Sequence, residues 1–373
     1  QDTEELKNID VGGLRIKSIS NYDNINLTTP SSRQFYEYKN ITNPLKSSGS
    51  IVSPPRYSYL ETKSNPICVN VANTTYLDPG IMTYRSRSSK NYLPLSGLQG
   101  YHIMYSDVKV YNDQSMVNGY THFKYSLADD DKSYNILRSA PVTSHDFERG
   151  DLLEQNIYKY NNGSYLPVKK VSNEYYYGFN RNSFFSDASF PNEKHALGLV
   201  INKLSGDLVC NVQGSWGMPI PPYRSLFEMS YFKLYSVWKY LKKSTESTYD
   251  KNGANPVTMI TNYNYNNPTH AQLSSVEMIN SEGETQSTKT FYAQDPEMTS
   301  KPFVADMIAK NMIQVPLDTQ TFKGTDKLSE QLTLFDKSTA TSNLLLPKEV
   351  YSAKFPNALA SIANIGSLEK KIT

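Results

Sequence analysis

The sequence predicts a mainly β protein in which successive antiparallel hairpins form an extended curved sheet. Apolar and polar residues alternate along many short segments, and glycine-containing turns separate these segments. The chain also has 29 tyrosines against 14 phenylalanines, and Tyr suits a half-buried strand surface because its ring packs while its hydroxyl stays wet. The turns are uneven in spacing and therefore indicate an imperfect repeat of hairpins; their glycines are Gly119, Gly163, Gly206, Gly253 and Gly283, with a weaker turn at Gly324.

The clearest hairpin lies between residues 240 and 267. Two alternating segments flank a polar turn that contains Asn252 and Gly253. Glycine adopts positive φ without a Cβ clash, and asparagine tolerates it better than most residues. The residues that share one face are Leu241, Thr245 and Tyr249 in the first segment, and Val257, Met259, Tyr263 and Tyr265 in the second.

The same pattern predicts further strands on both sides of this hairpin. The expected pairs are 14–19 with 34–39, 102–111 (with a bulge) with 120–125, 152–160 with 168–177, 195–204 with 207–212, and 272–279 with 285–292. Further strands are expected at 56–60, 67–71, 319–323, 330–335, 347–354 and 368–373. Residues 72–99 are rich in Ser, Asn, Pro and Gly, which predicts irregular structure.

Two segments have helical spacing. The stripe at 227–241 (Phe227, Tyr231, Leu234, Trp238 and Leu241) fits a helix, but its density of Tyr and Phe favours a strand. One short helix is predicted over 302–313, where Pro302 suits the first turn and Pro316 limits the end. Its expected apolar face consists of Val304, Met307, Ile308 and Met312.

Composition excludes several classes of protein. A formal net charge of +2 over 373 residues gives no case for a nucleic-acid partner. No apolar run approaches the roughly 20 residues that span a bilayer. Cys68 and Cys210 lack the spacing of a zinc site, and they are two isolated thiols or, in an oxidising compartment, a disulfide. Abundant Tyr, Ser, Thr and Asn favour an extracellular protein, and we expect the chain to be a segment of a longer one.

The segment SVWKYLKKSTESTYDKNG (236–253) resembles the YD-repeat, or Rhs-like, proteins of bacterial cell surfaces, whose repeats place Tyr-Asp shortly before a turn glycine. Tyr249-Asp250 is the clean pair, whereas Tyr160-Asn161, Phe335-Asp336 and Tyr22-Asp23 are looser. The chain therefore resembles the region upstream of the dense repeats. Further stretches are similar to the subgroup associated with type IX secretion: VGGLRIK (11–17), LQGYHIMYS (98–106), FERGDLL (147–153), NPTHAQL (267–273), NSEGET (280–285), AKNMI (309–313) and LLPKEVY (345–351).

The resemblance implies a partial Rhs-type β-shell. Residues 1–235 would form a pre-repeat region of irregular hairpins, and residues 236–373 a YD-repeat-like array with the short helix. The structural turn of the repeat would consist of Tyr249, Asp250, Asn252 and Gly253.

The implied function is a non-enzymatic scaffold in a secreted or cell-surface Rhs-like protein, enclosing a C-terminal effector or toxin segment. Its partners would be the remainder of its own polypeptide, with further YD repeats and the enclosed segment, and the secretion machinery. We expect no cofactor, nucleic acid or membrane span. The alternative is a cell-surface adhesin or carbohydrate-binding module that uses exposed aromatic residues, including Trp216.

Short motifs give no catalytic or metal site. Ser144-His145-Asp146 has the residue types of a catalytic triad, but neighbours in sequence cannot converge in that geometry, so we expect a turn. Arg149-Gly150-Asp151 matches an adhesion tripeptide and is interpreted as a turn into a strand. For Asp129-Asp130-Asp131 a solvated acidic loop is favoured over a calcium site. The five histidines are expected to have structural roles or to lie on the surface, although His102 and His122 could meet across one hairpin. They are His102, His122, His145, His195 and His270.

Overall fold

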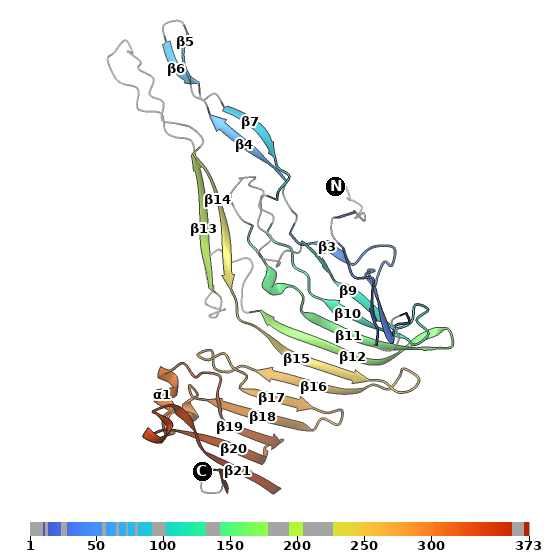
Figure 1. Cartoon of the computed structure of the whole chain (residues 1–373), viewed down its shortest axis with the longest axis vertical. Helices are drawn as coiled ribbons and strands as arrows, with labels where there is room; N and C mark the ends of the chain where they lie inside the picture. The colour runs from blue at the N-terminus through green and yellow to red at the C-terminus, as the bar shows by residue number, and fades with distance from the viewer. Residues whose placement is uncertain are drawn as a thin grey trace.

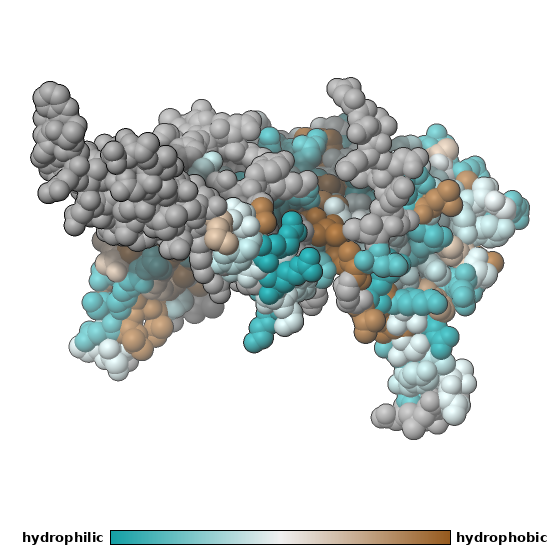
Figure 2. Space-filling model, turned by 90° about the horizontal axis from the view of Figure 1, so that it is seen from above, coloured by the Kyte–Doolittle hydropathy of each residue, from teal (hydrophilic) through white to brown (hydrophobic). Residues whose placement is uncertain are grey.

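The computed structural model describes residues 10–11, 14–23, 28–53, 57–64, 67–71, 74–78, 81–91, 102–131, 142–177, 194–203, 227–359 and 369–372. Within these ranges the protein is mainly β with one short α-helix, as the sequence predicts. Figure 1 shows the strands stacked in a long, twisted sheet, with hairpins projecting away from it. Seen from above, the described surface mixes hydrophilic and hydrophobic residues (Figure 2).

Fourteen of the described strands form one open antiparallel sheet, with β1 and β22 at its edges. Each strand pairs with the next strand of the sheet along the chain, apart from two excursions. In spatial order the strands are β1 (Ser18–Asn21), β2 (Ser32–Glu37), β9 (Asp107–Tyr111), β10 (Tyr120–Tyr125), β11 (Leu152–Asn161), β12 (Ser164–Tyr177), β15 (Lys239–Thr248), β16 (Val257–Asn264), β17 (Ser275–Ile279), β18 (Thr285–Tyr292), β19 (Pro316–Lys323), β20 (Asp326–Lys337), β21 (Leu345–Leu359) and β22 (Glu369–Ile372).

The two excursions leave the sheet as hairpins. Between β2 and β9 the pairs are nested, so that they form one long interrupted hairpin: β3 (Gly49–Ile51) with β8 (Ile103–Tyr105), β4 (Ser58–Ser64) with β7 (Ile81–Arg87), and β5 (Ile67–Val71) with β6 (Thr74–Asp78). Between β12 and β15 the excursion contains β13 (Lys194–Lys203) paired with β14 (Phe227–Ser236). Both excursions project from the stack in Figure 1.

Most of the predicted hairpins are confirmed. The turn at 118–119 joins β9 to β10, the turn at 162–163 joins β11 to β12, and the turns near 253, 283 and 324 join β15–β16, β17–β18 and β19–β20. The prediction that residues 227–241 are strand and not helix is also confirmed. β14 pairs with β13, and β15 pairs with β12 and β16.

Three predictions of local structure are wrong. The first strand begins at Ser18 and not at residue 14. Residues 72–99 contain β6 and β7, because pairing with β5 and β4 overrides a composition typical of loops. Residues 102–111 are two strands separated at Ser106, and β8 and β9 have different partners. β13 pairs with β14, and the expected partner at 207–212 lies outside the described residues, so that hairpin stays a prediction.

The projecting pair β13–β14 has one apolar face. The register brings together Leu199 with Tyr231 and Ile201 with Met229, and Leu197 lies beside them. These side chains are between 49% and 62% exposed. A contiguous apolar patch on such a projection is typical of an interaction surface.

Bulges bend the main sheet. The register shifts at Lys124/Tyr125, Ile157/Tyr158 and Glu174/Tyr175 in three successive strand pairs. An extra residue on one strand bends that strand and increases its local twist. Aromatic residues pair across the strands of this region, with ring centroids 4.9 Å apart for Tyr120 and Tyr158 and 4.2 Å apart for Tyr240 and Tyr265.

An apolar cluster lies where helix α1 (Val304–Ala309) meets β18–β21. Val304 and Met307 are 2% and 0% exposed, and they pack with the cluster of Ala293, Met298, Leu317, Leu332, Phe335 and Leu345. The helix is shorter than the predicted 302–313, because left-handed backbone at Phe303 and Asn311 (φ 59° and 56°) limits it on both sides. The predicted apolar face is wrong at Ile308, which is 40% exposed.

The predicted division at residue 235 falls in the projecting strand β14, and the main sheet continues from one side of it to the other. β12, from the first part, pairs from Lys169 to Tyr177 with β15, from the second part. The division into a pre-repeat region and a repeat array therefore stays a prediction based on sequence motifs.

Asp318 lies at the border of the apolar cluster. It is 4% exposed, and β19 places it opposite Leu332 of β20 and Phe291 of β18. Gln320 donates a hydrogen bond of 2.6 Å to its Oδ2, whereas its Oδ1 is buried without a hydrogen-bond partner. Burial penalises the charged carboxylate and raises the pKa of Asp318 to about 6, although the Gln320 amide favours the charged form.

We predict that Asp318→Asn stabilises the protein at neutral pH. The pKa of Asp318 is about 6 in the fold, against an ordinary value of 3.8, so the fold binds its proton more tightly than the unfolded chain does. This proton contributes up to about 3 kcal/mol to the free energy of unfolding. The contribution is fully present below about pH 4 and is lost as the pH rises through 6. Urea denaturation should find the variant more stable than wild type at pH 8 and equal or weaker at pH 4.

Asp336→Asn is the matched control, and its effect on stability should depend on pH in the opposite direction. Lys348 lies 2.9 Å from Asp336 and lowers the pKa of this carboxyl, so its contribution is present at neutral pH and lost in acid. A stability difference between wild type and Asp318→Asn that stays constant with pH would contradict the effect of burial on Asp318.

Candidate functional site

A row of polar side chains crosses one face of the main sheet. Directly paired residues of antiparallel strands project from the same face. The register aligns the row over seven neighbouring strands, in the order Glu37, Lys109, His122, Asn156, Lys170, Ser247 and Thr258. This face therefore carries hydrogen-bonding groups where a core-facing surface would carry apolar side chains.

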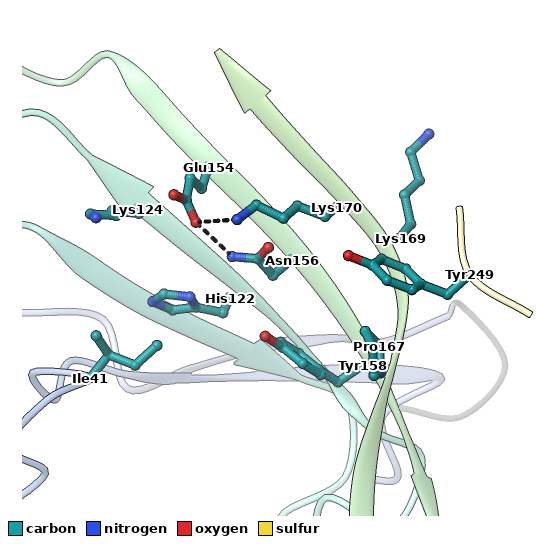
Figure 3. Close-up of a pocket in the computed structure, with 10 residues that line it drawn as sticks. All are labelled: Ile41, His122, Lys124, Glu154, Asn156, Tyr158, Pro167, Lys169, Lys170 and Tyr249. Carbon is teal, nitrogen blue, oxygen red and sulfur yellow. Dashed lines mark hydrogen bonds and ion pairs between the residues drawn. The ribbon is translucent and has the colours of Figure 1, made fainter. Parts of the chain in front are cut away.

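A groove of about 370 Å³ lies over the middle of this row. Strands β10, β11 and β12 form its floor, and Figure 3 shows the side chains that line it. The lining residues are Ile41, His122, Lys124, Glu154, Asn156, Tyr158, Pro167, Lys169, Lys170 and Tyr249.

His122 is the most buried polar side chain of the groove. It is 2% exposed, and its Nε2 lies 2.9 Å from Oδ1 of Asp107 on β9. A carboxylate only accepts hydrogen bonds, so this contact places a proton on Nε2. Its Nδ1 is buried and has no hydrogen-bond partner. Figure 3 shows the imidazole lying between Ile41 and Asn156.

Glu154, Asn156 and Lys170 form a small charged network beside His122. Asn156 Nδ2 donates to Glu154 Oε2 over 3.3 Å, and Lys170 Nζ lies 3.4 Å from the same oxygen. Burial favours the neutral acid, but the Asn156 hydrogen bond and the Lys170 ammonium together lower the pKa of Glu154. Glu154 therefore carries a negative charge that Lys170 balances.

One wall of the groove is apolar and aromatic. Tyr158 and Pro167 are paired residues of β11 and β12, and Tyr249 follows β15. Pro167 adjoins the bulge at Val168, which suits a residue without a backbone N–H. The carbonyl of Val168 accepts a hydrogen bond of 2.9 Å from the backbone of Tyr249, and this contact fixes that ring beside the groove.

The four predicted turn residues lie together between β15 and β16. Asp250 Oδ1 accepts hydrogen bonds from the backbone of Asn252 and Ala254, at 2.8 and 2.9 Å. The hydrogen bond from Ala254 and those from Asn255 and Asn252 lower the pKa of Asp250. Asp250 therefore organises the turn, while the membership of this turn in a sequence repeat stays a prediction.

Gly253 completes the turn with φ of +74°. A Cβ at this position would lie 2.9 Å from Cδ of Pro167 and 3.1 Å from Cβ of Leu166. Glycine is thus required both by the backbone conformation and by the close approach of β12.

The acidic run near residue 130 is not a solvated loop throughout. Asp130 and Arg149 are both 7% exposed and form a buried ion pair. Arg149 also donates from Nε to the carbonyl of Ala128. The prediction of a solvated loop is wrong for Asp130, because Arg149 from a later segment pairs with it in the interior. Asp129 and Asp131 are exposed.

The Ser144-His145-Asp146 segment enters a short 3-10 turn (Asp146–Glu148), as expected. His145 is fully buried, and its two ring nitrogens lie 3.0 Å from carboxylate oxygens of Asp131 and Glu148. Its ring also lies 5.5 Å from that of Tyr235 on β14. The segment therefore anchors the start of β11 to the projecting hairpin.

The adhesion tripeptide is not displayed for a receptor. Arg149 is held by Asp130, and Asp151 is 9% exposed. Lys239 Nζ lies 2.7 Å from Asp151 Oδ1, and the Tyr177 hydroxyl donates to Asp151 Oδ2 over 2.5 Å. Burial and this hydrogen bond to Asp151 raise the pKa of Tyr177. The motif joins β11, β12 and β15, and its interpretation as a turn into a strand is confirmed.

The other sequence candidates are scattered. His270 is 2% exposed and pairs with Asp295 over 3.0 Å. His102 precedes β8, whereas His122 is opposite Lys109, so the two histidines do not meet across a hairpin. Trp216 and Cys210 lie outside the described residues, and nothing is described of the side chains of His195 and Cys68.

Sequence reasoning missed the groove. The signal that could have found it is the two-residue turn at Asn162-Gly163, which fixes which residues of β11 and β12 oppose each other. Counting back from that turn places Lys169 opposite Asn156. The bulge at Val168 moves Lys170 there instead.

Comparisons with protein families and with curated proteins identify no relative. No protein-family model matches the chain, and no curated protein matches its sequence. No helix among the described residues is long and apolar enough to cross a membrane. In the same part of the chain, no group of three or more His, Cys, Asp or Glu side chains is placed to hold a metal ion.

We predict that Gly253→Ala lowers the free energy of unfolding by about 1–3 kcal/mol, because alanine is strained at positive φ and would contact Pro167. Gly283→Ala is the control, since Gly283 has φ of +81° but nothing within 4 Å of a Cβ. Urea denaturation should rank Gly253→Ala as the more destabilising of the two. Equal effects would mean that the contact with β12 contributes nothing.

Arg149→Ala should destabilise the protein by about 3–5 kcal/mol, because it leaves the Asp130 carboxylate buried without its partner. Lys243→Ala breaks the pair with Glu174 at 2.9 Å, where the side chains are 33% and 57% exposed, and should cost at most about 1 kcal/mol because water screens the pair. Thermal or urea denaturation of both variants checks the difference. A small effect of Arg149→Ala would contradict a structural role for the buried pair.

Proposed function

We propose that this chain is a structural, non-enzymatic wall segment of a secreted or cell-surface Rhs-like protein. The observation that supports the proposal most directly is the open sheet of fourteen described strands, in which strands follow one another almost in chain order. Such a sheet grows by adding one hairpin after another. Each new hairpin covers the edge left by the one before it.

The bulges support the same proposal. They lie in the successive pairs β10–β11, β11–β12 and β12–β15, and each bulge bends its strand and increases the local twist. A curved single sheet can surround a volume, whereas a flat one cannot. The partner that this proposal implies is the remainder of the same polypeptide, with further repeats that extend the wall and a C-terminal effector segment inside it.

The experiment uses the natural polypeptide that contains this sequence. The segment that follows it in the chain should resist added protease when attached to the wall and be degraded when expressed alone. Thr121→Pro on β10 should increase the rate of this degradation at least about 10-fold, because proline removes a backbone hydrogen bond from a central strand. Thr121→Val keeps that hydrogen bond and should leave the protection unchanged.

Two outcomes would overturn the proposed function. One is a natural polypeptide in which no segment follows Thr373. The other is a downstream segment that is degraded at the same rate with and without the wall.

A further inference from the structure

The groove over β10–β12 contains an unsatisfied buried acceptor that the wall does not need. His122 and His270 are both 2% exposed and both direct Nε2 to an aspartate. The Nδ1 of His270 accepts a hydrogen bond of 2.9 Å from the backbone N–H of Gln272. The Nδ1 of His122 has no such partner. A buried polar atom without a partner is costly, so a donor from outside the chain is expected at this position.

The groove combines a polar floor with an apolar wall. His122, Asn156, Glu154 and Lys170 form the floor, while Tyr158, Pro167, Tyr249 and Ile41 contribute rings and aliphatic carbon. A ligand that fits has an apolar face for the rings and polar groups around its rim.

The charges of the floor are balanced internally. Lys170 is paired with Glu154, and Lys124 is opposite the same carboxylate. Lys169 is paired with Glu246, and Asp107 accepts a hydrogen bond from Nε2 of His122. The floor offers both hydrogen-bond acceptors and donors to a ligand. The lone pair of His122 Nδ1 and the side-chain carbonyl of Asn156 accept hydrogen bonds, and the Lys170 ammonium donates them. Hydroxyl groups both donate and accept, so a neutral polyhydroxylated ligand satisfies all of these groups.

Two other classes of ligand fit less well. An extended peptide binds most readily by pairing with a free strand edge, but the floor strands have neighbours on both sides. A nucleic acid requires a surplus of positive charge, which a floor of paired charges lacks.

We propose that this groove binds a neutral saccharide unit, either free or at the end of a glycan. One face of the sugar ring lies against the aromatic wall formed by Tyr158 and Tyr249. Its rim hydroxyls bond to His122 Nδ1, Asn156 and Lys170. The site is independent of any segment that the wall encloses.

The full chain is titrated with glucose, galactose, mannose and N-acetylglucosamine by isothermal calorimetry and is applied to an array of neutral and acidic glycans. We expect a neutral sugar to bind with a Kd of about 1 mM or tighter. Tyr249→Ala and Lys170→Ala should each weaken binding about 3- to 10-fold, because one removes a stacking ring and the other a charged donor.

Tyr263→Ala is the matched control, because Tyr263 is a half-buried tyrosine on β16 that does not line the groove. It should bind the sugar as wild type does. Circular dichroism establishes that all three variants are folded, and Lys170 is exposed enough (42% of its side chain) for its variant to fold. Absence of binding to every sugar and glycan, binding to acidic glycans alone, or equal binding by wild type and both groove variants would overturn the proposal.

Discussion

The structure depends on backbone pairing between neighbouring strands. Among the described residues, the cluster of buried apolar side chains lies beside α1 and β18–β21, at one end of a much longer sheet. From β2 to β17 the strands are joined by ladder hydrogen bonds, aromatic pairs such as Tyr176 and Tyr240, and rows of polar side chains. Each strand is therefore stabilised mainly by its two neighbours, and a break in one ladder divides the sheet into two parts.

Hairpins with short turns were predictable from sequence because their pairing is local. Asn162-Gly163 has positive φ at both residues (46° and 92°), which is the geometry of a two-residue hairpin turn. The same logic placed the strands on either side of Gly253 and Gly283. The helix was predictable from the spacing of Val304 and Met307, but its length was set by the backbone at Phe303 and Asn311.

Pairing between distant segments was not predictable in the same way. β4 and β7 are joined only through the nested β5–β6 hairpin, and β13 and β14 are separated by more than twenty residues. No turn signal specifies such partners. Buried charge was missed for a related reason: Asp130 looks solvated within its acidic run, and only the approach of Arg149 from a later turn makes it part of the interior.

The groove adds a constraint that backbone pairing alone does not impose. His122 needs Asp107 from the strand before it, Asn156 from the strand after it, and the side chain of Ile41 from a loop outside the sheet. These residues come from four separate stretches of chain. Their convergence on one unsatisfied nitrogen distinguishes this part of the wall from a surface that is merely polar.

The bulge at Val168 has a consequence for how this sequence can diverge. Side chains alternate between the two faces of a strand, so a shift of register by one residue exchanges their faces. The bulge absorbs one extra residue without such a shift, because Tyr158 is opposite Pro167 and Ile157 is opposite Lys169. Deleting Val168 would therefore remove the bend and leave Lys170 opposite Asn156. A single insertion or deletion between Lys170 and Tyr177 would instead exchange the faces of the residues that follow it. Homologues that share this groove are expected to conserve the number of residues between Lys170 and Tyr177 more strictly than their identities.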